Sequence, residues 1–143
     1  MSTDENKALE RRWFEAFDKG KDAVMAATDE LYSNDFVLHS ATGEDMHGLK
    51  DTKKYMDDIF SAFPDIHMTL DDIVAEGDKV TVRFTVTGTH KGRFMGASPT
   101  NKKMKIWSIQ IDRIASGKFV EGWERTDTLG LMQQLGLISK PKK

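Results

Sequence analysis

The chain of 143 residues contains no cysteine, only three prolines, and no apolar run long enough to cross a bilayer. Without cysteine it has no disulfides, no thiolate nucleophile and no cysteine-ligated metal, which fits a reducing compartment. The N-terminal sequence MSTDENKALERR lacks the apolar segment and small-residue cleavage site of a secretion signal. We therefore expect a cytoplasmic protein that does not act at a membrane.

The sequence also lacks a strongly basic region. Its formal net charge is −2, and the only basic cluster is the terminal Lys140, Lys142 and Lys143. Nucleic-acid binding requires a basic face that neutralises phosphates, so we expect no nucleic-acid partner. The four histidines show no spacing typical of zinc ligands, so we expect no metal site.

What is present is typical of a globular protein. Hydrophobic residues make up 38% of the chain and charged residues 31%. A chain of this length suits a single domain over residues 1–143.

The first part of the chain shows the three- and four-residue spacing of amphipathic helices. Ser2 and Glu5 can form a capping box, which predicts a first helix that continues to Gly20. A second helix is predicted over 21–32 and a third over 49–63, before Pro64. Between them we expect a short strand at 36–39 and a polar loop at 41–45.

After Pro64 the hydrophobic period changes to two, which predicts strands. Valine, phenylalanine and polar residues alternate over 80–87, and two further strands are predicted at 104–114 and 118–128. A tight turn at Ser116-Gly117 joins these last two strands, and a short helix over 129–135 follows. Helices followed by hairpin-joined strands indicate an α+β fold: a curved, mostly antiparallel sheet wrapped by three N-terminal helices around an interior pocket.

The two faces of the last hairpin carry different side chains. The even positions include polar Ser108, Gln110, Glu124 and Thr126. The odd positions include Trp107, Ile109 and Trp123. Because a two-layer domain buries only one sheet face, these apolar residues predict a homodimer with the sheets packed back to back. The alternative is that the chain's own helices and tail cover them.

The turn at Ser116-Gly117 also places Gln110 almost opposite Glu124. An apolar pocket would raise the pKa of Glu124 toward that of a base working near neutral pH. Gln110 can donate a hydrogen bond that orients a carbonyl group. We therefore hypothesise that Glu124 is the acid/base and Gln110 the carbonyl donor; the alternative is a purely structural Glu–Gln hydrogen bond.

Other side chains are expected around the same pocket. By strand parity His90 points inward as a second donor or proton carrier, although a structural histidine at a strand end is the alternative. His39 ends the short strand and is expected at the pocket mouth. Polar Ser108 and Thr126 are expected in the pocket floor. The helices are expected to supply lining residues from their apolar faces: Trp13, Phe17, Tyr55, Met56 and Phe60.

Three stretches carry a family resemblance. The sequence GTHKGRFMG at 88–96, followed by Pro99-Thr100, resembles a signature of the SnoaL-like polyketide (ester) cyclases. The ending DTLGLMQQLG at 127–136 and the opening ERRWFEAF at 10–17 are similar to the same family. The resemblance spans almost the whole chain.

The resemblance implies a nuclear transport factor 2-like, cystatin-like cone, in which three helices close the wide end of a bent sheet. Cyclases of this family close rings by intramolecular aldol condensation without a metal or organic cofactor. Their carboxylate position falls on Glu124, where the cyclases have aspartate, and their histidine position falls on Gln110. We therefore expect a cofactor-independent cyclase or isomerase acting on a hydrophobic carbonyl compound. The alternative is a non-catalytic module of the same fold that binds a hydrophobic ligand or associates with other proteins.

Overall fold

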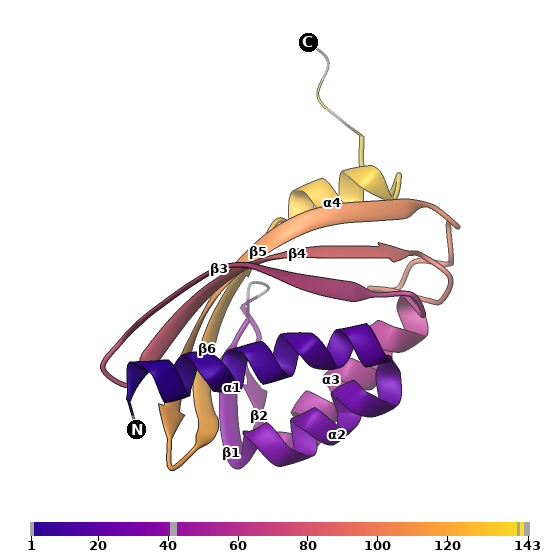
Figure 1. The fold of residues 1–143 in the computed structure, drawn as a ribbon. Coiled ribbons are helices and arrows are strands. Elements are labelled where there is room, and N and C mark those ends of the chain that lie inside the picture. Colours follow the sequence, from indigo (N-terminus) through magenta and orange to yellow (C-terminus); the bar gives the residue numbers. More distant parts are fainter. Residues whose placement is uncertain (1, 41–42, 140, 142–143) are drawn as a thin grey trace.

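The computed structural model describes residues 2–40, 43–139 and 141. A curved sheet arches over three helices, α1 (Thr3–Ala16), α2 (Lys21–Leu31) and α3 (Gly48–Ala62), which all lie on one side of it (Figure 1). The 3-10 turn η1 (Phe17–Lys19) links α1 to α2. A short helix, α4 (Thr128–Gln134), follows the last strand and packs beside β5 (Lys103–Ala115). This arrangement confirms the predicted α+β class and its three N-terminal helices.

The first helix begins where the sequence predicts. The backbone N–H of Glu5 donates to Ser2 Oγ, and the backbone N–H of Ser2 donates to Glu5 Oε1, both at a distance of 3.1 Å. This capping box satisfies two N–H groups that the helix itself leaves free. The face of α1 that carries Leu9 and Trp13 is buried against the sheet. The helix ends at Ala16, and a 3-10 turn completes the segment before Gly20.

The sheet has six strands in the order β2-β1-β6-β5-β4-β3. In addition to β5, the strands are β1 (Tyr32–His39), β2 (Met46–His47), β3 (His67–Glu76), β4 (Lys79–Thr89) and β6 (Lys118–Thr126). Neighbouring strands are antiparallel except β1 and β6, which are parallel. The sheet is therefore mixed but mostly antiparallel, as expected.

Most predicted bounds agree with the structure to within one or two residues, and three differences have a structural reason. Strand β1 begins at Tyr32, not at residue 36, because the irregular register between Tyr32 and Val37 lets the polar residues there stay within the strand. Strand β2 lies directly after the expected loop, of which residues 41 and 42 fall outside the described part. Strand β6 ends at Thr126 because Asp127 caps α4 and accepts a hydrogen bond from the Gly130 N–H at 2.9 Å.

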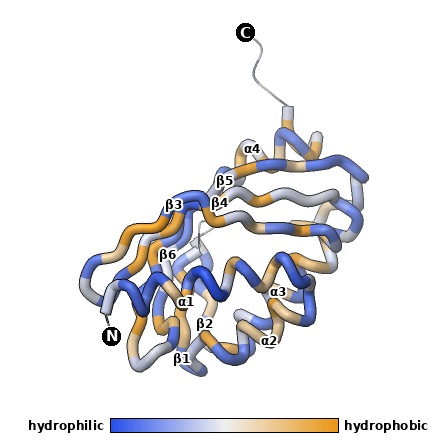
Figure 2. Tube along the Cα trace, in the orientation of Figure 1, coloured by the Kyte–Doolittle hydropathy of each residue, from blue (hydrophilic) through white to orange (hydrophobic). Residues whose placement is uncertain are grey.

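The core lies between the concave face of the sheet and the helices. Along the strands hydrophobic and hydrophilic residues alternate, so that one face is apolar (Figure 2). Val80, Val82 and Val86 are all buried on that face, and the ring of Phe84 lies 5.1 Å from that of Phe14 on α1.

The loop after β4 is fixed to the end of α3. The N–H groups of Lys91 and Gly92 both donate to the Ala62 carbonyl, at 2.9 and 3.0 Å. A Cβ at position 92 would lie 2.0 Å from the Ser61 carbonyl oxygen, so only glycine permits this approach. The central glycine of the 88–96 motif, Gly92, therefore serves packing.

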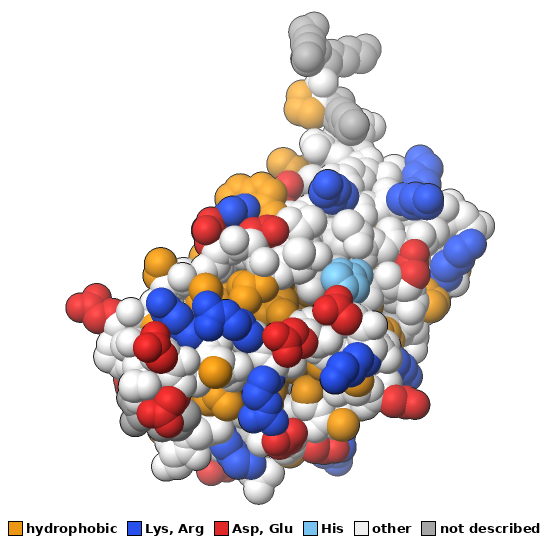
Figure 3. All heavy atoms as spheres, viewed as in Figure 1, with side chains coloured by type: hydrophobic (Ala, Val, Ile, Leu, Met, Phe, Trp, Pro, Cys, Tyr) orange, Lys and Arg blue, Asp and Glu red, His pale blue; other side chains and the backbone are white. Residues whose placement is uncertain are grey.

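The outer surface of the helices carries charges of both signs. Acidic and basic side chains are interspersed on the face shown in Figure 3. Exposed pairs such as Lys21–Asp57 and Lys53–Asp29 link α2 to α3, each contributing little to stability because water screens them. In the described part of the chain no helix is both long and apolar enough to span a bilayer.

Candidate functional site

A cavity of about 720 Å³ lies between the concave face of the sheet and the helices. Its size falls within the range of small-molecule sites. Strands β1, β4, β5 and β6 and helices α1, α3 and α4 all contribute to its wall. Much of that wall is aromatic or aliphatic, and includes Trp13, Phe14, Phe36, Leu38, Met56 and Phe63.

Glu124 and Gln110 face each other across β6 and β5, as the sequence predicts. They are partners in the strand register, and Ser108 and Thr126 form the next such pair on the same face. All four residues line the cavity. The polar floor expected from the alternation of the last hairpin is therefore present.

Glu124 receives a directed chain of hydrogen bonds. Thr126 Oγ1 donates to Glu124 Oε1 at 2.7 Å, and Ser108 Oγ lies 2.9 Å from Thr126 Oγ1. Because the single Thr126 hydroxyl proton is directed at Glu124, Ser108 is the donor in the second bond. Burial raises the pKa of Glu124, the Thr126 hydrogen bond lowers it, and the charge of Asp112 raises it further.

Gln110 does not bond Glu124 directly. Its Nε2 donates to Asp112 Oδ1 at 2.7 Å, which leaves its second amide N–H without a protein partner among the described residues. The expected structural alternative, a direct Glu–Gln hydrogen bond, is therefore not what this structure shows. An ionised Asp112 accepts hydrogen bonds only, so it fixes the amide with its NH₂ group directed along the sheet.

A second buried carboxyl meets Asp112 from α1. Glu10 and Asp112 are 1% and 2% exposed, both line the cavity, and they are hydrogen-bonded to each other. Such a bond requires one of the two to carry a proton. Burial and the charge of Asp112 raise the pKa of Glu10 well above its usual range, while bonds from Glu10 and Gln110 oppose the upward shift that burial gives the pKa of Asp112. The pair therefore holds one shared proton and carries one negative charge.

The strand opposite Asp112 is shaped to admit it. Gly122 is its register partner, and a Cβ at position 122 would lie 2.7 Å from Asp112 Oδ1. Tyr32 is buried beside the same carboxyls, and burial together with the charges of Asp112, Glu10 and Glu124 raises the pKa of its phenol. The carboxyls of Glu10 and Asp112 and the phenol of Tyr32 thus lie together on the cavity wall.

Sequence reasoning missed Glu10 and Asp112, although a signal for both was present. Glu10 lies four residues after Asn6 and four before Phe14, on the buried face of α1. Asp112 shares the even parity of Gln110 on β5. A charged residue on the buried face of a helix or strand is unusual unless it has a partner. The position of Glu10 and Asp112 on such faces was therefore the signal.

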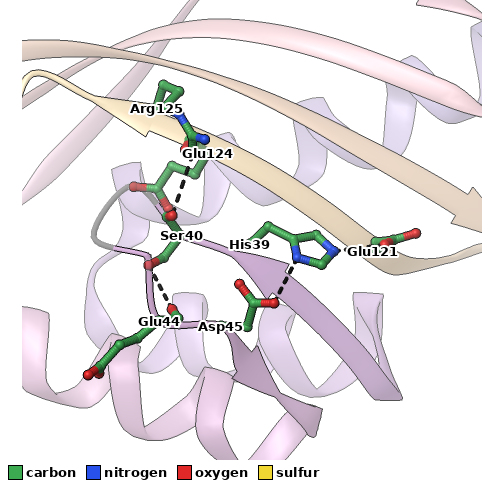
Figure 4. Close-up of polar contacts among 7 residues, drawn as sticks. All are labelled: His39, Ser40, Glu44, Asp45, Glu121, Glu124 and Arg125. Carbon is green, nitrogen blue, oxygen red and sulfur yellow. Dashed lines mark hydrogen bonds and ion pairs between the residues drawn. The ribbon is translucent and has the colours of Figure 1, made fainter.

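His39 does not line the cavity. Its ring lies between two carboxylates, with Nδ1 2.9 Å from Asp45 Oδ2 and Nε2 2.8 Å from Glu121 Oε2 (Figure 4). The ring also stacks on Trp123, its register partner on the outer face of the sheet. The hydrogen bond that His39 Nε2 donates to the Glu121 carboxylate is the main cause that raises the pKa of His39. The expected pocket-mouth position is replaced by an ion-paired bridge, because the histidine side chain follows the outward parity of Trp123.

His90 is fully buried and also lies outside the cavity lining. Its Nδ1 accepts from the Thr100 backbone N–H at 3.2 Å, so the ring proton lies on Nε2, which has no partner in the described part of the chain. The rings of Phe63 and Phe94 pack around it. The structure therefore places His90 where the structural alternative has it, joining β4 to the loop that returns at Thr100.

The expected helical lining divides in two. Trp13, Met56 and Tyr55 line the cavity, and Tyr55 keeps 36% of its surface exposed. Phe17 and Phe60 are instead buried in the core, where their rings stack 6.0 Å apart. Ile59 and Phe63, on either side of Phe60 in the chain, do line the cavity, so the shared apolar face did not distinguish core from lining.

The outer face of the sheet carries the predicted apolar residues. Trp107 is 54% exposed and Ile109 39% exposed, while Trp123 is partly covered by His39. Trp107 and Ile109 therefore remain exposed in the described chain. Among the residues described, no three histidine or acidic side chains are close enough together to hold a metal ion.

Comparison with known proteins identifies the family. The SnoaL-like polyketide cyclase family matches residues 7–135. No curated protein gives a significant match. AclR from Streptomyces galilaeus, whose suggested activity is that of a hydroxylase, is similar in structure with a TM-score of 0.83 and 30% identity, over 99% of this chain and 87% of AclR.

Two further structures show the same fold. IdmH from Streptomyces antibioticus, a suggested polyketide cyclase, has a TM-score of 0.77 and 27% identity over 91% of this chain and 97% of its own. A SnoaL-like protein from Jannaschia has a TM-score of 0.87 and 20% identity over 96% and 95% of the two chains. These likenesses confirm the nuclear transport factor 2-like fold. The chain belongs to the SnoaL-like polyketide cyclase family.

Proposed function

We propose that the protein is a cofactor-independent cyclase or isomerase that acts on a hydrophobic carbonyl compound, with Glu124 as its acid/base. The observation that carries this proposal is a carboxyl group on the wall of an apolar cavity, where burial raises its pKa. A carboxylate with a raised pKa is a stronger base, and a general base is most effective when its pKa lies near the working pH.

The chemistry begins with removal of a proton from the carbon next to the substrate carbonyl. Glu124 takes this proton, and its bond from Thr126 holds the carboxylate in place. The free N–H of Gln110 donates to the carbonyl oxygen, which carries the negative charge of the enolate. In an isomerisation Glu124 returns the proton to another carbon; in a cyclisation the enolate carbon attacks a second carbonyl and Glu124 protonates the new alkoxide.

Proton exchange tests this assignment without knowledge of the natural substrate. The aromatic ketone 2-tetralone, incubated in D₂O, is expected to exchange its α-protons faster with the protein than in buffer, as followed by proton NMR. Removing a general base costs about 10²- to 10⁴-fold in rate, so Glu124→Gln is expected to lose most of the acceleration.

The matched control is Glu76→Gln, the same substitution at an exposed position at the end of β3. It is expected to leave the exchange rate unchanged. Equal rates for wild type and Glu124→Gln would refute the role of Glu124.

The alternative function is a binding module without chemistry. It is favoured by the cavity lining, which contains no histidine among the described residues. In that case a hydrophobic ligand would raise the melting temperature while wild-type exchange equals that of buffer. We also propose that the exposed Trp107 and Ile109 form the interface of a homodimer, with the two sheets packed face to face.

A further inference from the structure

The charged residues of the cavity wall are all of one sign. Five acidic residues line it, and none of its described lining residues is lysine, arginine or histidine. The acidic residues are Glu10, Glu44, Asp45, Asp112 and Glu124. A polyketide-type carbonyl compound does not by itself explain this imbalance, because a neutral ligand needs no excess of carboxyls.

Two of these carboxyls are positioned to carry negative charge toward the interior. Glu124 pairs with Gln110 and Asp112 with Gly122, so the two carboxyls are diagonal neighbours on one sheet face. Glu10 and Asp112 share one proton and therefore add a single negative charge there. Arg125 is exposed on the opposite face and donates to the backbone carbonyls of Glu124 and Ser40, as Figure 4 shows. His39 pairs with Asp45 from outside the cavity lining.

The same wall contains a polar group without a protein partner. Tyr32 is buried and lines the cavity, and its phenol oxygen has no hydrogen bond to any of the described residues. Buried polar groups are nearly always satisfied, so an unpaired phenol oxygen at a cavity wall indicates a ligand with a polar group.

We propose that the cavity binds a hydrophobic amine. Its ammonium group lies between Asp112 and Glu124, and its hydrocarbon part contacts the aromatic side chains that line the cavity. An ammonium group supplies up to three N–H donors for carboxylate and phenol oxygens. The rings of Trp13 and Tyr32, in T-shaped contact with centroids 5.3 Å apart, line the same cavity. The apolar lining around these carboxyls favours a cation that carries a hydrocarbon part.

This inference rests on the cavity being the ligand site proposed above, and it narrows the class of carbonyl substrate to one that also carries a basic nitrogen. Two unit charges about 6 Å apart, at an effective dielectric constant of about 20, change a binding constant by about a hundredfold. Desolvation of the ammonium group offsets part of that gain. A net preference of at least about tenfold for an amine over its neutral isostere is therefore expected.

Three probes with one hydrocarbon skeleton test the proposal: 2-naphthylmethylamine, 2-naphthylmethanol and 2-naphthoate. Titration calorimetry at neutral pH measures their binding to the wild-type protein. The amine is expected to bind at least about tenfold more tightly than the alcohol, and the carboxylate more weakly than either. Glu124→Gln is expected to reduce the amine preference, whereas the matched surface variant Glu76→Gln keeps it.

The outcomes separate this inference from the proposed function. A carboxylate that binds as well as the amine, or an amine preference unchanged in Glu124→Gln, refutes the amine site alone. Failure of all three probes to bind refutes both the amine site and the cavity as a site for hydrophobic ligands. The relative affinities of the three probes for the wild-type protein test the amine site on their own. The proposal can therefore be refuted even if Glu124→Gln fails to fold.

Discussion

Replacing Glu10 by glutamine tests the buried proton of the Glu10–Asp112 pair. The fold raises the pKa of Glu10, so the folded protein keeps a proton that the unfolded chain releases above the ordinary pKa of glutamate. Between the unfolded and folded pKa values, ionisation therefore favours the unfolded state. Wild-type stability falls across that window by up to about 1.4 kcal/mol per pH unit for this one group.

Glu10→Gln removes this pH dependence but keeps a donor, because its amide N–H replaces the carboxyl O–H toward Asp112. The stability of the variant relative to wild type is therefore expected to improve steadily as the pH rises above the pKa of an exposed glutamate. Below that pH both states of wild-type Glu10 are protonated, and the difference is expected to be constant.

Urea unfolding at steps of one unit from about pH 5 to about pH 8 measures this difference. Glu124 also has a raised pKa, but it titrates in both proteins, so most of its contribution cancels in the comparison. Glu76→Gln serves as the control for loss of one surface charge. A stability difference independent of pH would refute the claim that Glu10 is a protonated, buried acid.

Three other predictions concern packing and assembly. Gly122→Ala is expected to destabilise the fold by about 1–3 kcal/mol in urea unfolding, since the new methyl would lie 2.7 Å from Asp112 Oδ1; unchanged stability would contradict that crowding. Thr100→Val removes the hydroxyl next to His90 Nδ1 and is expected to cost about 1 kcal/mol, with a midpoint equal to wild type as the contrary result. Trp107→Glu is expected to halve the mass measured by light scattering at micromolar concentration, and a wild-type monomer would rule out the proposed dimer.

Much of the fold follows from local patterns in the sequence. The capping box at Ser2 and Glu5 and the change of hydrophobic period after Pro64 are both local in the sequence. The helices and strands that they predict agree with the structure. The register of Gln110 with Glu124 follows from one tight turn, because a hairpin with a short turn leaves a single pairing. Strand β2 was not predicted because two residues give no detectable alternation.

The candidate site was harder to predict because it depends on contacts between distant elements. Asp112 forms part of the site because the fold places Glu10 of α1 next to it. The residue spacing within α1 or β5 alone does not predict this contact. His39 and His90 illustrate the opposite error. Both share parity or position with a pocket, yet Asp45 with Glu121 binds one ring and Thr100 the other, outside the cavity. His39 follows the outward parity of its register partner Trp123, and His90 is bound by the loop that returns at Thr100.

The central claim is that Glu124 is a sheltered carboxyl within a ligand cavity. A carbon-13 NMR titration of glutamate carboxyl groups, with the Glu124→Gln variant to assign the signal, measures this directly. The account predicts a midpoint above that of exposed glutamates, and a further increase when neutral 2-naphthylmethanol displaces water from the cavity. A midpoint equal to that of exposed glutamates, insensitive to the probe, would contradict it.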